Sequence, residues 1–95
     1  MATDELFISV EPDPARQGIR IDKSKYDRMH NIILYNLRRY GPMTFTQLGT
    51  LVEDELYDTF SGSVMWYYTL VKQDMEAHGE LRRVPRSRPQ IVEAV

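Results

Sequence analysis

The chain of 95 residues contains no cysteine, which excludes disulfide bonds and thiolate metal ligands. It has no uninterrupted apolar run of the roughly 18 residues that a membrane-spanning helix needs. Its N-terminus does not have the basic, apolar and small-residue order of a signal peptide. Absence of cysteine fits a reducing compartment, so we predict a cytoplasmic protein with no membrane partner.

The motifs of common enzyme sites are also missing. There is no glycine-rich phosphate loop, no metal-binding pair and no nucleophile elbow. His30 and His78 fall on or beside the apolar stripes of predicted helices, where a histidine is more often a core residue than a base. The acidic residues of segment 53–58 lack the spacing and tight glycine turn of a calcium loop, so we interpret them as a solvated helix end. We predict no enzymatic activity, no cofactor, no metal and no small-molecule substrate.

Charge of neither sign dominates, since 14 acidic and 12 basic side chains give a formal net charge of −2. Nucleic-acid-binding domains are commonly basic, but here the distribution is uneven. Residues 1–14 carry acidic charges only, residues 16–39 carry seven basic side chains against two acidic ones, and residues 81–92 contain four arginines and no acid. Local potential governs association more than total charge does, so the basic zones are candidate contacts for an anionic partner.

Two helices are predicted before the middle of the chain. The first is capped by Asp22 or Ser24 and runs to about Tyr40. Its core face follows the 3.6-residue period at Tyr26, Met29, Ile33, Leu37 and Tyr40. The second begins with a capping box formed by Thr44 and Gln47. Its predicted buried face comprises Phe45, Leu48, Leu51, Val52 and Leu56.

A third helix and a hairpin complete the predicted fold. The helix ends at Gly79, where a left-handed C-terminal residue belongs. Its predicted core stripe is Val64, Tyr67, Tyr68, Val71, Met75 and His78. Residues 81–84 and 90–92 are predicted strands joined by a tip with two prolines, and residues 43–44 supply a third strand. This predicts a mainly α fold with a small β-hairpin, a three-helix winged helix-turn-helix domain over residues 19–95.

Several short segments carry a resemblance to known proteins. At the first helix they are Arg20-Ile21-Asp22, Lys25-Tyr26 and Met29, and in the third they are Trp66-Tyr67, Val71, Asp74-Met75-Glu76-Ala77 and Gly79. From about Arg20 to Val92 the chain resembles winged-helix proteins, and more narrowly a group of small uncharacterised prokaryotic winged-helix proteins. The resemblance implies the fold, and it implies nucleic-acid binding only by analogy.

The arginines of the hairpin are the first candidates for binding nucleic acid. They are Arg82, Arg83, Arg86 and Arg88. A guanidinium group suits backbone phosphates or a minor groove, whereas the alternative interpretation is a solvated sheet edge that resists aggregation. We expect Arg38, Arg39 and Lys72 to assist, and Thr69 and Gln73 to face base edges from the third helix. Lys72 is the only basic residue of that helix, which weakens the base-reading interpretation.

The third helix has more apolar surface than one small domain buries. Trp66, Leu70 and Ala77 extend its apolar arc to about 200°, beyond the usual 100° or so. Trp66 packed within its own chain is the favoured interpretation. One way to do this is for the apolar run Leu6, Phe7, Ile8 and Val10, within an N-terminal arm of residues 1–18 that is flexible or strand-forming, to fold back over Trp66. The next choice is a homodimer through Trp66 and Leu70, together with Ile32 and Leu34 of the first helix.

Our leading functional prediction is a module that binds double-stranded DNA in a transcription-regulator-like role. The alternative is a protein-interaction or dimerisation domain that keeps the winged-helix scaffold without a DNA role. The acidic total charge and the Trp66 arc favour this alternative, and the segregation of arginines to the hairpin favours the first.

Overall fold

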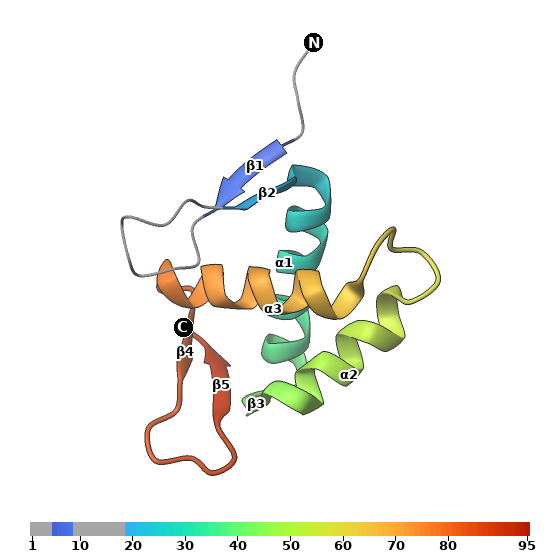
Figure 1. Cartoon of the computed structure of the whole chain (residues 1–95). Helices are drawn as coiled ribbons and strands as arrows, with labels where there is room; N and C mark the ends of the chain where they lie inside the picture. Colours follow the sequence, from blue (N-terminus) through green and yellow to red (C-terminus); the bar gives the residue numbers. More distant parts are fainter. Residues whose placement is uncertain (1–4, 9–18) are drawn as a thin grey trace.

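The computed structural model describes residues 5–8 and 19–95, and in this part the chain is mainly helical, with two small antiparallel sheets (Figure 1). In chain order the elements are β1 (Glu5–Ile8), β2 (Ile19–Asp22), α1 (Lys23–Tyr40), β3 (Met43–Thr44), α2 (Phe45–Leu56), α3 (Val64–Ala77), β4 (Leu81–Arg83) and β5 (Ile91–Ala94). None of the helices within these residues is long and apolar enough to cross a bilayer.

Helix α1 begins where its capping signal predicts. The carboxylate of Asp22 accepts a hydrogen bond from the backbone N–H of Ser24 at 2.9 Å, and Gly41 follows the last helical residue. Tyr26, Met29, Ile33 and Leu37 are buried as expected. The prediction for Tyr40 is wrong, since its side chain is 59% exposed. It lies one turn past Leu37, where the chain leaves the helix to form β3 and the core has ended.

Helices α2 and α3 pack closely through a residue without a side chain. The predicted capping box is present, because the hydroxyl of Thr44 accepts from the N–H of Gln47 and the Gln47 side chain accepts from the N–H of Thr44. Gly49 faces the ring of Tyr68, and an added Cβ would lie 3.0 Å from Cε2 of that ring. The Tyr68 hydroxyl donates to the carbonyl of Phe45 at 2.6 Å, which ties α3 to the first turn of α2.

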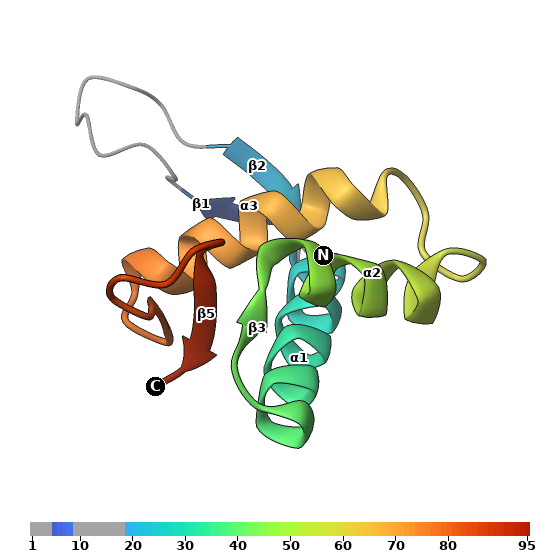
Figure 2. The same ribbon diagram turned by 90° about the horizontal axis from the view of Figure 1, so that it is seen from below.

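The predicted hairpin forms, and it is part of a three-stranded sheet with the order β3-β5-β4. Met43 pairs with Val92, so the expected short strand at 43–44 is confirmed. Gly79 has φ +76°, the left-handed conformation predicted for it, and reverses the chain between α3 and β4. Seen from below, β3 lies beside β5 and next to α1 (Figure 2). We call residues 81–94 the wing.

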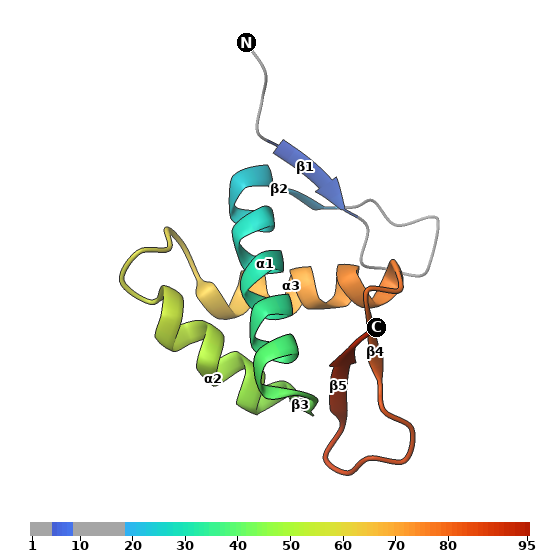
Figure 3. The same ribbon diagram turned by 180° about the vertical axis from the view of Figure 1, so that it is seen from behind.

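The core lies between α1, α2, α3 and the inner side of the wing sheet. Its fully buried members include Met29, Ile33, Leu48, Leu56, Tyr68, Val71, Met75, Leu81 and Val92. Helix α3 lies in front of α1 in one view and behind it in the view turned by 180°, so the two helices form opposite faces of the domain (Figures 1 and 3). The core prediction for His78 is wrong, because its side chain is 66% exposed just after the end of α3.

The apolar run of the arm forms a strand over its described part. β1 pairs with β2 in a two-stranded sheet, in the register Leu6 to Ile21 and Ile8 to Ile19. Val10 lies outside the described residues. The sequence analysis did not predict β2, and this strand leads directly into α1 at Asp22.

Candidate nucleic-acid interface

The two arginines at the base of the wing are already bound to carboxylates. The guanidinium of Arg82 donates to Glu93, which faces it across the β4–β5 ladder. Arg83 Nε donates to Glu76 of α3 at 3.1 Å, and this hydrogen bond raises the pKa of Arg83. Glu93 therefore neutralises Arg82, whereas Arg83 shares the single carboxylate of Glu76 with Lys72. Both arginine side chains are 61% exposed, but the carboxylate beside each reduces its attraction for a phosphate.

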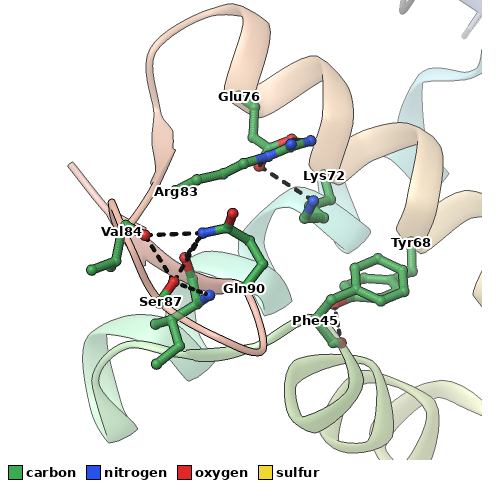
Figure 4. Close-up of polar contacts among 9 residues, drawn as sticks. Phe45, Tyr68, Lys72, Glu76, Arg83, Val84, Ser87 and Gln90 are labelled. Carbon is green, nitrogen blue, oxygen red and sulfur yellow. Dashed lines mark hydrogen bonds and ion pairs between the residues drawn. The ribbon is translucent and has the colours of Figure 1, made fainter.

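The tip of the wing is held by a small hydrogen-bond network (Figure 4). The hydroxyl of Ser87 donates to the carbonyl of Val84 and accepts from the N–H of Ile91, both at 2.8 Å. The Gln90 amide donates to the same carbonyl and to the same hydroxyl, both at 3.0 Å. These contacts close the loop between β4 and β5 and fix its shape.

Arg86 and Arg88 are the exposed cations of this fixed loop. Neither has a carboxylate partner among residues 5–8 and 19–95. Arg86 has φ +63°, a conformation that costs a non-glycine residue roughly 1–2 kcal/mol. Backbone strain of this kind concentrates at functional sites. The tip thus presents two unneutralised guanidinium groups on a backbone shape that glycine would adopt more easily.

The outward side of α3 exposes both apolar and uncharged polar side chains and almost no charge. Gln73 is exposed, as predicted, and Thr69 is partly exposed with its hydroxyl donating to the carbonyl of Met65 at 2.8 Å. Met65 and Trp66 lie on the same side of the helix, near its N-terminal end. Gln73 is therefore the one predicted base-contacting residue whose side-chain amide is both exposed and without a hydrogen bond within the described residues.

Lys72 was predicted to face outward, and this prediction is wrong. Its side chain is only 8% exposed, with Nζ 3.2 Å from Glu76 and 5.2 Å from the centre of the Phe45 ring. Glu76 binds both Lys72 and Arg83 (Figure 4), so it joins the middle of α3 to the wing. The four-carbon stem of the lysine is buried against the α2–α3 contact, and its charge is used inside the domain.

Arg38 and Arg39 are exposed, but they belong to a different surface. They lie in the last turn of α1, on the side of that helix opposite to Met29 and Ile33 of the core. With Asn31, Leu34 and Tyr35 they line an open groove of about 500 Å³. The nine predicted nucleic-acid contacts therefore do not form one continuous surface.

The residues predicted to form a dimer interface differ in exposure. Trp66 is 46% exposed, so the favoured interpretation that it packs inside its own chain is wrong for the described residues. Leu70 is buried in the core, and this excludes it from an open interface. Ile32 and Leu34 are partly buried and pack against the core of their own chain. Trp66, with the exposed Met65 beside it, is what remains of the predicted interface.

A buried polar cluster between α1 and α3 was not predicted from the sequence. Asp74 is 2% exposed, accepts a hydrogen bond from the hydroxyl of Tyr26, and lies 3.4 Å from Nδ1 of His78. Burial and the neighbouring carboxylate raise the pKa of Tyr26. The position of Asp74 three residues after Val71 was the available signal, since that spacing places it beside the core stripe. Asp74 and Tyr26 are enclosed between the two helices and join α1 to α3, whereas His78 is exposed at the edge of the cluster.

Comparison with known proteins identifies a family without identifying an activity. No curated protein and no solved structure matched the chain. A family model described as a family of unknown function, DUF6958, matches residues 8–91, which include every helix and the wing tip. The chain therefore belongs to the DUF6958 family.

Proposed function

We propose that this chain is a winged-helix domain that binds duplex DNA, with the tip of the wing on the phosphate backbone. The α2–α3 pair corresponds to a helix-turn-helix, and the β4–β5 hairpin that follows, paired with β3 in one sheet, corresponds to a wing. The observation that carries the proposal is the wing tip, where Arg86 and Arg88 are exposed and unneutralised. A regulatory role in transcription is the cellular function that such a domain would serve.

The proposed contacts differ in what they recognise. Arg86 and Arg88 bind phosphate oxygens, which position the domain without reading sequence. Gln73 is suited to adenine, because its amide both donates and accepts a hydrogen bond at the base edge. Only a weak sequence preference is expected, since one exposed amide on a nearly uncharged helix offers few base contacts.

A salt titration with random duplex DNA tests this proposal. Two neutralised phosphates give a slope of log affinity against log salt of about −2. The double variant Arg86→Ala plus Arg88→Ala should flatten the slope to near zero. Arg82→Gln plus Glu93→Gln is the matched control, because it removes an arginine together with the carboxylate that binds it and leaves the net charge unchanged. No binding at low salt, or equal losses for the tip and the control variants, would refute the proposal.

The variant Arg86→Gly separates binding from folding. Glycine adopts φ +63° without strain, so this variant should unfold at the same or higher temperature than the parent chain. Its affinity for DNA should nevertheless fall. A variant that loses stability and affinity together would show instead that Arg86 holds the loop.

The second candidate function is a protein-interaction domain, favoured by the exposed Met65 and Trp66 on α3. Trp66 is the only tryptophan, so its fluorescence reports on this surface alone. A blue shift of its emission as protein concentration rises, absent in Met65→Ser, would support self-association there. Quenching of Trp66 emission by duplex DNA, with an emission that does not change with protein concentration alone, would support the first proposal instead.

A further inference from the structure

The exposed side of α1 carries a basic and aromatic surface that the wing does not explain. Its residues are Asn31, Leu34, Tyr35, Arg38 and Arg39, which line a groove of about 500 Å³. Their spacing of i, i+3, i+4, i+7 and i+8 places them on one face of the helix. We call this set the α1 stripe. Helix α1 lies on the opposite face of the domain from α3 (Figures 1 and 3).

The positive charge of the α1 stripe exceeds what the helix end itself needs. Residues 28–52 contain no acidic side chain, and neither Arg38 nor Arg39 has a carboxylate partner in the described ranges. The C-terminal end of a helix is equivalent to about half a negative charge. Two guanidinium groups therefore leave an excess of roughly one and a half positive charges at this end of α1.

Aromatic rings accompany this charge. Tyr35 is 54% exposed within the stripe, and Tyr40 is exposed at its end. The guanidinium carbon of Arg39 lies 5.5 Å from the centre of the Tyr40 ring, which restrains the arginine beside the groove. A solvated helix face needs no exposed tyrosines, whereas rings next to arginines form the platform on which unpaired bases stack.

We propose that the α1 stripe is a binding site for a ligand with an unstacked base and a phosphate, such as a segment of single-stranded nucleic acid. Tyr35 stacks on the base, and Arg38 and Arg39 bind the phosphate that follows it. A duplex does not offer this combination, because its bases are stacked and paired inside. The site is separate from the wing tip and does not depend on the function proposed for it.

The test measures fluorescence anisotropy of a labelled single strand of about ten nucleotides, long enough to span such a site. Arg38→Ala plus Arg39→Ala should weaken binding about tenfold or more and reduce the salt slope by about 1.4. Tyr35→Ser should weaken binding about fivefold or more, whereas Tyr35→Phe should keep it, since the phenyl ring still stacks.

Two control variants match these changes. Tyr57→Ser removes a tyrosine just after α2 that is more exposed than Tyr35, and Arg86→Ala plus Arg88→Ala removes two arginines at the wing tip. Tyr57→Ser should change single-strand affinity by no more than about twofold, and the tip variant should weaken it less than Arg38→Ala plus Arg39→Ala does. Duplex binding measured on the same proteins reports separately on the wing, so each proposal can fail alone.

Competitors distinguish the sources of the ligand. Displacement by adenosine monophosphate as well as by unlabelled single strand identifies a free nucleotide as a ligand of the same site. Displacement by inorganic phosphate or polyglutamate as effectively as by the single strand would overturn the proposal, because neither contains a base. Unchanged affinity of Tyr35→Ser, or equal losses for the two double-arginine variants, would also overturn it.

Discussion

The inner side of α3 buries its polar groups against partners in the protein, whereas the outer side leaves them in water. The inner side contains Tyr68, Lys72 and Asp74, all buried and each with a named partner in α1, α2 or α3 itself. The outer side exposes Trp66 and Gln73, and none of the exposed side chains of α3 is charged. The ionised groups of this helix are therefore used inside the domain, and the exposed arginines without a carboxylate partner lie at the wing tip and at the end of α1 in the described ranges.

The comparison predicts large effects on stability from inner changes and small ones from outer changes. The inner groups find their partners inside the fold: the carbonyl of Phe45 for Tyr68, the carboxylate of Glu76 for Lys72 and the hydroxyl of Tyr26 for Asp74, whose Oδ1 has no hydrogen-bond partner. Truncation of one group therefore leaves a buried partner unpaired. The outer groups keep their contact with water in the folded and unfolded chain alike. Four measurements of the free energy of unfolding test this difference.

Asp74→Ala should give the largest loss, about 2–3 kcal/mol, because it leaves the buried hydroxyl of Tyr26 without an acceptor. Chemical denaturation of the variant measures it. The double variant Tyr26→Phe plus Asp74→Leu removes both polar partners with little change of shape, and it should recover at least half of the loss. A double variant less stable than Asp74→Ala would contradict this account.

The second largest effect is expected at high pH, where ionisation of buried tyrosines should lower the free energy of unfolding. Burial raises the pKa values of Tyr26 and Tyr68 above the ordinary value of 10.0. The unfolded chain loses these protons above about pH 10 while the folded chain keeps them, so the free energy of unfolding is constant below that pH and falls above it. Each tyrosine contributes at most about 1.4 kcal/mol per pH unit. Tyr26→Phe plus Tyr68→Phe should flatten the profile, and an unchanged profile would show that other groups cause it.

Gly49→Ala should cost about 1–2 kcal/mol. The added methyl would lie 3.0 Å from the Tyr68 ring, which is held by its hydrogen bond to Phe45 and by stacking on that residue. Overpacking of about 1–3 kcal/mol exceeds the gain of up to about 1 kcal/mol in helix propensity. Thr50→Ala, an exposed neighbour in α2, is the control for thermal unfolding. A stabilised Gly49→Ala would mean that the ring can move aside.

Trp66→Ala should have the smallest effect, below about 1 kcal/mol, because about half of the indole already contacts water. The residual cost comes from its edge-to-face contact with Tyr67 at 4.9 Å. A larger loss would show that Trp66 stabilises the domain as much as the buried residues of α3 do, which would contradict the difference between the two sides.

Local signals predicted most of the element boundaries. The cap at Asp22, the capping box of Thr44 and Gln47 and the left-handed Gly79 depend on neighbours within a few residues, so a sequence expresses them directly. The strand β2 was missed because its pairing with β1 joins segments that are separated by residues 9–18.

The candidate site was predicted less well, because the availability of each arginine or lysine depends on whether the fold places a carboxylate beside it. The predicted strand ended at Val92, but β5 continues to Ala94 and places Glu93 opposite Arg82. Glu76 is near Lys72 in sequence, but only the return of the chain at Gly79 brings Arg83 to the same carboxylate. Periodicity assigns a residue to a face of its helix, and it does not report these partners.

Glu76 also has a consequence for how a ligand would meet this domain. Because one carboxylate accepts from a lysine of α3 and an arginine of β4, the angle between helix and wing is set in the free protein. A preorganised pair of elements loses little conformational freedom on association, so more of the contact energy remains as affinity. Glu76→Gln would loosen this link between helix and wing, although Leu81 and Val92 would still hold the wing on the core.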